Sequence, residues 1–243
     1  MVRDHNPFRT ALPVFILLLV SGPALAQQTV PRFEVGAQFS LLSRNRPSML
    51  VIHPVVPGFI GFAPADKRTE PGFGGRFSYN LTKSIAFEAE GNLFPKSEFD
   101  GSAASELMGR EPGGRVFQGQ FGVKAGKRFR RFGIFGKARP GFVGFTKVTK
   151  LLGTSNINNP APFPPFTVGR FGNGRELYFS TDLGAVVEYY HSRRIFARFD
   201  LGDTIIHYRS FAGSGASLSR AIIVRPPETK HSLQFSAGVG FRF

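Results

Sequence analysis

The chain has 243 residues, carries a formal net charge of +15 and contains no cysteine. Its length suits one all-β domain, and the lack of cysteine excludes a disulfide framework, a thiolate metal site and a cysteine nucleophile. The positive charge favours an anionic partner, such as nucleic acid, an anionic membrane surface or an acidic polymer.

Residues 1–26 have the pattern of a secretory signal peptide. A basic start precedes the apolar run "ALPVFILLLV" at 11–20, and the small residues "ALA" end at Ala26, where we expect cleavage. The apolar run is too short to cross a bilayer as a helix. We therefore expect Sec-type export and a mature domain over 27–243. Because an exported protein meets little nucleic acid, we expect no nucleic-acid partner.

The mature chain alternates apolar and polar residues with a period of two in eight segments. The first is "FEVGAQFSL", and the last is "HSLQFSAGVGFRF", in which every second residue from Leu233 to Phe243 is apolar. Such alternation predicts half-buried β-strands. In chain order, the predicted strands are 33–41, 73–81, 85–93, 117–125, 132–142, 177–189, 195–203 and 231–243. The alternation slips at Gly202–Asp203, which predicts a bulge or a barrel rim there.

The connections between these segments fall into two classes. The connections after strands two, four and six are short, around "TKS", "GKRFRR" and "YHSRR". The others are long, at 43–71, 95–115, 146–175 and 205–229. Transmembrane barrels show this asymmetry, with short periplasmic turns and long external loops.

The strand lengths fit the same architecture, because a tilted strand needs ~9–11 residues to cross the hydrocarbon. A sheet in lipid must also close on itself, since every backbone N–H and C=O needs a partner. The mature chain has no apolar run long enough for a transmembrane helix. We therefore predict an all-β fold, an eight-stranded antiparallel up-and-down transmembrane β-barrel closed by pairing of the last strand with the first.

The polar face of the predicted strands carries six basic and six acidic residues, whereas the apolar face carries none apart from Asp203. A charge on the lipid face near mid-membrane costs about 2–4 kcal/mol, whereas matched charges inside a narrow barrel can pair. We therefore expect a lumen plugged by ion pairs. The candidate residues are Glu34, Arg76, Glu88, Glu90, Lys124, Lys137, Arg139, Asp182, Glu188, Arg198, Asp200 and Arg242.

The excess positive charge then falls in loops, turns and termini, most densely in "KAGKRFRRF" at 124–132. This run fits contact with an anionic surface partner, such as lipid head groups or cell-wall polymer, and it equally fits a solvated turn beside a membrane.

Residues for catalysis or metal binding are sparse. The five histidines show no metal-binding spacing, so no metal or cofactor is expected. Asp203, His207 and Ser210 come nearest to a catalytic triad, but they lie in and beside one predicted loop. We expect a protein that is not an enzyme.

The ordered set of features resembles the OmpA-type outer-membrane β-barrel domain family over essentially the whole mature chain. The resemblance lies in the signal peptide, the eight strands, "FGKARPGF" (135–142), "FARFDLGD" (196–203) and "GVGFRF" (238–243). It implies location in the bacterial outer membrane, with outer-membrane lipids and the barrel-assembly machinery as partners. It also implies that Phe243, a terminal aromatic residue, belongs to the assembly signal. The best-known members carry a C-terminal peptidoglycan-binding domain. Because this sequence ends with its last predicted strand, we expect a barrel more similar to the small stand-alone ones, without that domain.

The leading hypothesis is a structural or surface-interaction role through long extracellular loops. Three alternatives stay open: a minor channel, a lipid-modifying outer-membrane enzyme, and a soluble lipocalin-like binding barrel. The last remains because alternation alone does not distinguish the inside of a barrel from its outside.

Overall fold

The computed structural model describes residues 31–45, 47, 49–52, 60–63, 67–95, 113–157, 166–214 and 222–243. The predicted signal peptide lies outside the described residues. The chain divides into two compact units, Met1–Val30 and Pro31–Phe243, and the strands all belong to the second. No helix in the described residues is long and apolar enough to cross a membrane.

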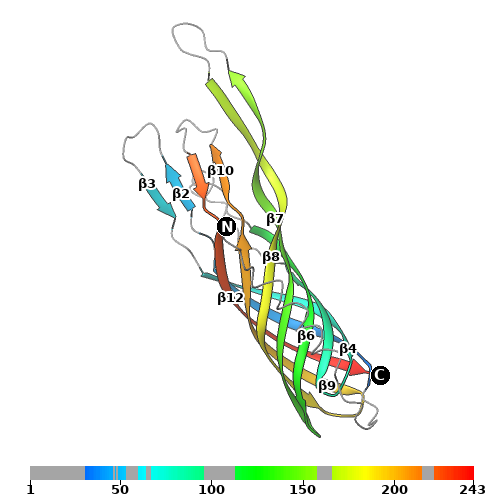
Figure 1. Cartoon of the computed structure of the whole chain (residues 1–243). Coiled ribbons are helices and arrows are strands. Elements are labelled where there is room, and N and C mark those ends of the chain that lie inside the picture. The colour runs from blue at the N-terminus through cyan, green and yellow to red at the C-terminus, as the bar shows by residue number, and fades with distance from the viewer. Residues whose placement is uncertain are drawn as a thin grey trace, which may run out of the picture. The chain divides into compact units, whose positions relative to one another are not determined.

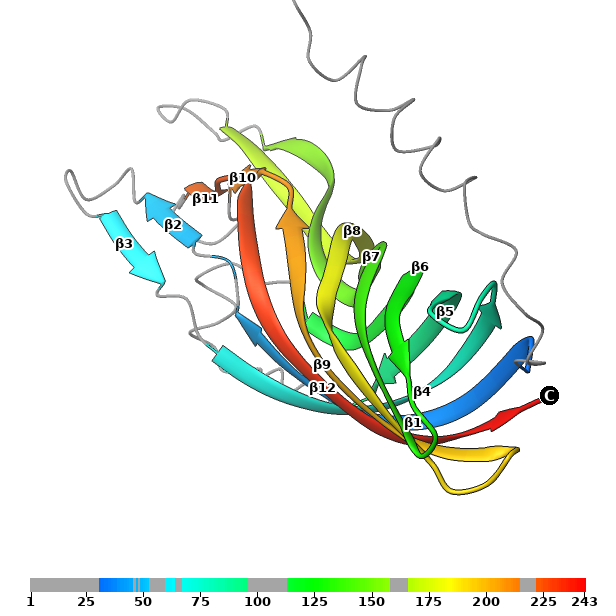
Figure 2. The same ribbon diagram turned by 60° about the horizontal axis from the view of Figure 1, so that its bottom comes forward.

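Eight antiparallel strands close into a barrel in the order β1-β12-β9-β8-β7-β6-β5-β4 (Figures 1 and 2). Each barrel strand pairs with the barrel strands before and after it in the chain, which makes the topology up-and-down. The predicted all-β, closed, eight-stranded antiparallel fold is therefore confirmed. The strands are β1 Phe33–Asn45, β4 Lys67–Asn80, β5 Ile85–Phe94, β6 Gly113–Arg128, β7 Phe132–Ile157, β8 Phe166–Tyr190, β9 Ile195–Tyr208 and β12 Glu228–Arg242.

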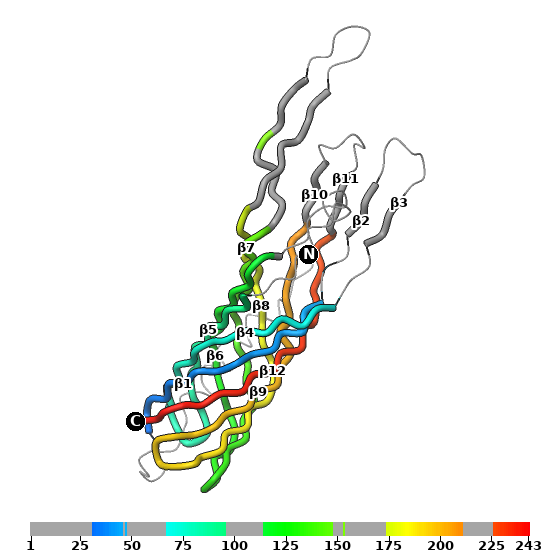
Figure 3. The backbone as a smooth tube through the Cα atoms, turned by 180° about the vertical axis from the view of Figure 1, so that it is seen from behind, coloured from blue at the N-terminus to red at the C-terminus, as the bar shows by residue number. Residues whose placement is uncertain are grey.

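The seam between the last strand and the first closes the barrel. β12 pairs with β1 in continuous register, with Val35 opposite Phe241 and Leu41 opposite Phe235. The backbones of Phe33 and Phe243 exchange two hydrogen bonds, of 3.0 and 2.9 Å. We call the end of the barrel that holds this pair and the short turns 81–84, 129–131 and 191–194 the turn end, and the opposite end the loop end (Figure 3).

Three predicted loops contain more strand than expected. The hairpin of β7 and β8 continues from the Val148–Gly174 pair to the Ile157–Phe166 pair, with register shifts at Phe145/Val148 and Leu151/Gly153. Most of the predicted third loop is therefore paired backbone. The sequence there mixes glycine, lysine and β-branched residues without alternation, so its pattern predicts no strand.

The first and fourth predicted loops meet in a second, four-stranded sheet with the order β10-β11-β2-β3. Its strands are β2 Met49–Ile52, β3 Ile60–Ala63, β10 Phe211–Ser214 and β11 Ile222–Arg225. The pairing of Val51 with Ile223 joins segments that the sequence places at opposite ends of the chain.

Of the two alternatives predicted at Gly202–Asp203, a bulge or a barrel rim, the bulge is wrong. Gly202 and Asp203 pair in unbroken register with Gly184 and Leu183 on one side and with β12 on the other. The alternation continues through this point, and the side chain of Asp203 belongs to the outward face.

The two faces of the barrel differ sharply in polarity. Phe121 is 68% exposed on the outer face, whereas Lys124 and Arg139 on the inner face are 0% exposed. Large apolar side chains project outward from every barrel strand, and we call this set the apolar belt. It comprises Val35, Phe39, Phe73, Phe77, Phe87, Leu93, Phe121, Val123, Ile134, Phe142, Leu177, Phe179, Leu183, Val187, Phe199, Leu201, Leu233, Phe235 and Val239.

Candidate functional site

The candidate site is the lumen, because the period of two sends every second side chain of eight strands into one narrow interior. Its contents change along the barrel axis. A charged layer fills the half nearer the turn end, a neutral polar layer follows, and an apolar layer occupies the loop end.

Lys124 on β6 is the centre of the first cluster in the charged layer. Its Nζ atom lies 2.6 Å from Glu188 Oε1, 3.3 Å from Glu88 Oε1 and 3.4 Å from Glu34 Oε2. Arg128, four residues along β6 toward the turn end, lies 3.0 Å from Glu34 and 3.7 Å from Glu188. One buried ammonium group thus joins carboxylates from β1, β5 and β8.

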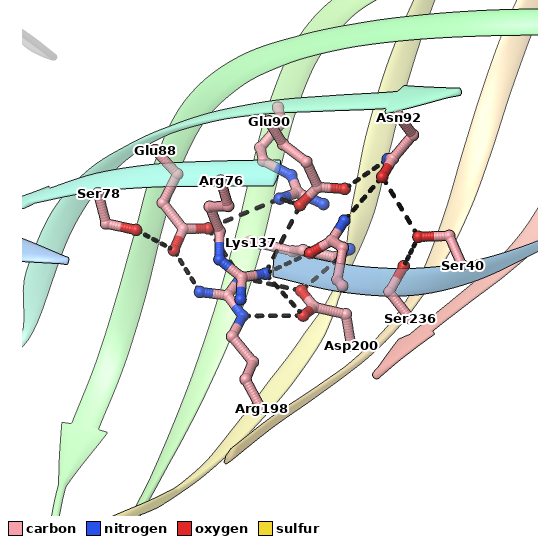
Figure 4. Close-up of polar contacts among 12 residues, drawn as sticks. Ser40, Arg76, Ser78, Glu88, Glu90, Asn92, Lys137, Arg198, Asp200 and Ser236 are labelled. Carbon is pink, nitrogen blue, oxygen red and sulfur yellow. Dashed lines mark hydrogen bonds and ion pairs between the residues drawn. The ribbon is translucent and has the colours of Figure 1, made fainter. Parts of the chain in front are cut away.

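Arg198 on β9 is the centre of the second cluster, which Figure 4 shows. Its Nε donates to Asp200 Oδ2 at 2.8 Å, and its Nη2 donates to Glu88 Oε2 at 2.9 Å. Its Nη1 donates to the second oxygen of Glu88, so the contact with Glu88 is bidentate. Ser78 donates to the same carboxylate at 3.1 Å. Paired guanidinium and carboxylate groups of this geometry are the strong form of a charged hydrogen bond.

Arg139 on β7 extends the network toward the polar layer. It donates to Asp182 Oδ2 at 2.6 Å and to Glu90 Oε2 at 2.5 Å. Lys137 Nζ lies 2.8 Å from the same Asp182 oxygen. The pair has room because residue 202 is glycine: a Cβ there would come 2.4 Å from Asp182 Oδ1 and 3.1 Å from Lys137 Nζ.

Arg76 on β4 completes the charged layer. It donates to Asp200 at 3.2 Å and to the amide oxygen of Gln38 at 2.9 Å. Its ion pair with Glu90 is longer, at 3.7 Å.

Within the described residues, the ion pairs of the charged layer join six carboxylates to six cationic side chains. Burying a charge is costly unless it is paired and hydrogen-bonded, and this matching meets that condition. The carboxylates are Glu34, Glu88, Glu90, Asp182, Glu188 and Asp200, and the cations are Arg76, Lys124, Arg128, Lys137, Arg139 and Arg198.

The neutral polar layer crosses the lumen through amide side chains. Gln118 on β6 donates to Gln234 on β12 at 2.9 Å and accepts from Asn92 at 3.0 Å. Asn92 in turn accepts from Gln38 at 2.8 Å. A parallel contact joins Ser40 and Ser236 at 2.8 Å, at the seam of β1 and β12 (Figure 4).

The apolar layer fills the lumen at the loop end with side chains that are almost completely buried. Ring centroids lie 5.6 Å apart for Phe145 and Tyr178, and 4.9 Å apart for Tyr178 and Tyr208. Arg44 stacks 4.8 Å from the Phe145 ring and pairs with Glu70 at 2.9 Å. The layer comprises Leu42, Phe94, Val116, Val143, Phe145, Tyr178, Ile206 and Tyr208.

The apolar layer was not among the predictions from the sequence. Leu42, Phe94, Val116, Val143 and Ile206 all lie just outside the predicted strand ends. The sequence does contain a signal for this layer, since each of these residues continues the series of inward-facing positions of its strand.

One predicted lumen residue lies elsewhere. Arg242 is at the rim of the turn end, where it donates to the carbonyl oxygens of Arg193 and Ser192 at 2.7 and 2.9 Å. It falls on the inward-facing positions of β12, but because it is the last residue of that strand its side chain reaches the neighbouring turn. Arg128, predicted to lie in a basic turn, has the lumen contacts instead.

The residues considered for a triad do not assemble into one. The carboxylate of Asp203 lies 2.5 Å from His231 Nδ1, and His207 Nδ1 lies 3.0 Å from the hydroxyl of Thr229. Ser210 is exposed after the end of β9. Among the described residues, no group of three His, Cys, Asp or Glu side chains has an arrangement suited to a metal ion.

No protein-family model and no curated protein matches the chain. Among solved structures, it is similar to the outer membrane protein OprG of Pseudomonas aeruginosa, with 10% identity, a TM-score of 0.47, and coverage of 88% of this chain and 96% of that one. It is also similar to Neisserial surface protein A, with 12% identity, a TM-score of 0.42, and coverage of 87% and 97%.

A further similarity is to the N-terminal β-barrel domain of OprF from Pseudomonas aeruginosa, with 13% identity, a TM-score of 0.38, and coverage of 85% and 97%. Likeness at this level concerns the fold alone.

Proposed function

We propose that the chain is an integral β-barrel of the bacterial outer membrane, with a closed lumen and a structural or surface-interaction role at its loop end. The observation that carries this proposal is the reversed polarity of the barrel: the apolar belt faces outward and the paired charges face inward. Soluble proteins rarely expose contiguous apolar patches larger than a few hundred Å². In hydrocarbon, the same belt is stabilising, and closure of the sheet gives the strand backbones their partners.

The height of the belt on β9 is close to the apolar band of transmembrane barrels, which is about 25 Å tall. At the turn end the belt is bordered by exposed aromatic rings, including Phe33, Phe132 and Tyr189, which is where transmembrane barrels have an aromatic girdle. At the loop end the outward face becomes polar at the Asp203–His231 pair. Ile195 and Asp203 are the limits on β9, and at ~3.3 Å per residue with a tilt of ~40° they lie roughly 20 Å apart along the axis.

The contents of the lumen favour the hypothesis of a closed barrel rather than that of a channel. Cross-lumen contacts fill the charged layer and the polar layer, and the apolar layer lies beyond them. A lipocalin-like binding barrel would need an apolar cavity, whereas this interior holds paired charges over half its length. The lipid-modifying alternative loses its candidate residues, because Asp203 and His207 have different partners.

A surface role is supported by the paired backbone beyond the barrel. The β7–β8 hairpin and the four-stranded sheet give the loop end regular structure in place of plain connections. Such structure can present a fixed surface to a partner, and we propose no enzyme activity for it.

The test is to express the full chain in a Gram-negative host and separate inner membrane, outer membrane and soluble fractions. We expect the protein in the outer-membrane fraction, with heat-modifiable migration on a gel. Recovery of a folded barrel from the soluble fraction, without detergent, would overturn the proposal.

A further inference from the structure

The turn end of the barrel carries a dense set of exposed positive charges. Seven exposed cationic side chains lie just before β1 and in or beside the three short turns, and we call them the basic crown. They are Arg32, Lys83, Lys127, Arg130, Arg131, Arg193 and Arg194. The segments that hold them, 31–33, 81–85, 125–132 and 191–195, contain no Asp or Glu, and neither does the neighbouring segment 241–243.

The lumen does not neutralise the crown. Glu34 and Glu188, the lumen carboxylates closest to the turn end along their strands, are buried and already paired with Lys124 and Arg128. Since the charged layer has equal numbers of acids and bases, the positive charge of the crown is in excess at this end among the described residues.

Local hydrogen bonds hold the crown in place. The hydroxyl of Thr82 accepts from the backbone N–H groups of Ser84 and Ile85 at 3.1 and 3.0 Å, and this turn presents Lys83. The hydroxyl of Ser192 makes the same two contacts, at 3.2 and 2.9 Å, in the turn that presents Arg193 and Arg194. Two turns of the same construction therefore fix their cations at the rim.

The third turn combines cations with aromatic rings. The rings of Phe129 and Phe132 stack at 4.5 Å, and Lys127 Nζ lies 5.5 Å from the Phe129 ring. Aromatic rings at this position suit the head-group region of a membrane, with the basic side chains reaching just beyond it.

We propose that the basic crown binds the phosphate head groups of anionic phospholipids in the leaflet that faces the turn end. This proposal depends on the membrane location proposed above. A Lys or Arg close to an anionic membrane surface is attracted to it, and seven surround one narrow barrel. The alternative is that the basic crown is only a solvated surface, which would show no preference among lipids.

The chain contains no tryptophan, so one introduced residue gives an unambiguous fluorescence reporter. We would compare Phe132→Trp, in the girdle beside the crown, with Leu177→Trp, on the outward face near the loop end. Each protein is refolded into vesicles of equal phosphatidylcholine and phosphatidylglycerol, with bromine on the acyl chains of one lipid or the other. The ratio of the two quenching efficiencies reports the local lipid preference.

Two variants with equal loss of charge complete the design. The crown variant is Arg130→Gln, Arg131→Gln, Arg193→Gln and Arg194→Gln. The matched control at the loop end is Arg115→Gln, Lys147→Gln, Arg175→Gln and Arg209→Gln, whose side chains are also exposed.

In the Phe132→Trp protein we expect phosphatidylglycerol to be preferred about fivefold, the equivalent of about 1 kcal/mol. The crown variant abolishes this preference without changing the preference measured in the Leu177→Trp protein. The control variant leaves the preference in the Phe132→Trp protein intact. Salt at 1 M, where the Debye length is about 3 Å, lowers it toward none.

Three outcomes would overturn the inference: no preference in the Phe132→Trp protein, a preference that survives in the crown variant, or an equal loss in the control. Crown-dependent pelleting with purified cell-wall polymer, without any lipid preference, would assign the crown to that polymer instead. If brominated lipids quench neither reporter, the barrel is not in the bilayer, and it is the proposed membrane function that fails.

Discussion

The guanidinium of Arg198 holds both oxygens of Glu88 although the two residues lie on opposite walls of the barrel. β9 and β5 have three strands between them in either direction around the sheet, and the two residues are 110 positions apart in the chain. Their direct contact shows that the lumen is only as wide as two side chains. The contact therefore acts both as a cross-brace between walls and as part of the barrier to flow.

Glu88→Gln is the direct test of the cross-brace. The substitution keeps the size of the side chain and removes a charge that also faces Lys124 at 3.3 Å. Breaking one partner of a buried ion pair leaves an uncompensated charge, and we expect a loss of roughly 3–5 kcal/mol in the free energy of unfolding. Equilibrium urea unfolding of the refolded protein in micelles measures it.

The matched control for this prediction is Glu228→Gln. Glu228 pairs with Lys230 at the loop-end start of β12, where both side chains are partly exposed. Exposed pairs contribute less than about 1 kcal/mol. Equal losses in the two variants would show that the lumen network adds no more than a surface pair does.

The lumen contains three barriers in series, so opening one should not create a pore. We expect no unitary current in planar bilayers from the wild type, or from Arg198→Ala, Gln118→Ala or Phe145→Ala alone. Each single variant widens one layer and leaves the two others closed. The triple variant should conduct and should select cations, because the carboxylates of the charged layer then exceed its cations.

Heat-modifiable migration of each variant would show that the barrel has folded before its conductance is compared. A current from Phe145→Ala alone would mean that the apolar layer is the sole barrier.

Much of this arrangement could be predicted from the alternation of residues. The alternation alone places Glu88, Arg198 and Lys124 on one face and the apolar belt on the other, because successive side chains of a strand point to opposite sides. The alternation does not indicate which residues meet across the lumen. The Arg198–Glu88 contact depends on the closure and the width of the barrel, which are properties of the whole sheet.

The ends of the strands could not be predicted from the contrast between polar inner and apolar outer residues. Next to Leu42, Phe94 and Val143 the outward neighbours are also apolar or small, so the polar signal on the inner face disappears where the apolar layer begins. Arg242 shows that the alternation can also predict a lumen residue wrongly. It falls on the inward-facing positions of β12, but because it is at the end of the strand its side chain lies among the carbonyl groups of a turn.

The depth of the apolar belt can be measured with single arginines. Val187 lies on the outward face of β8 opposite Phe199, which is midway between Ile195 and Asp203 on β9, whereas Ile195 lies beside the turn at 191–194. Val187→Arg should destabilise the barrel in lipid vesicles by about 2–4 kcal/mol, and Ile195→Arg by about 0–1 kcal/mol, because the cost of a charge falls toward the interface. Guanidinium unfolding from vesicles compares them. Equal effects of the two substitutions would argue that this face does not cross hydrocarbon.

The last residue allows a recognition role to be separated from a structural one. Phe243 pairs with the Phe33 backbone, and its ring lies 5.9 Å from that of Phe33 and 6.1 Å from that of Phe241. If the terminal aromatic residue is read during assembly, Phe243→Ala should lower the amount of folded barrel in the outer membrane of cells. It should have little effect on refolding of the purified chain in detergent, since the backbone hydrogen bonds do not need the ring. Phe241→Ala is the matched control, because it removes the same kind of ring two residues earlier in the chain, at the end of β12. Equal losses of both variants in cells would assign Phe243 to packing at the turn end and would remove the case for an assembly signal.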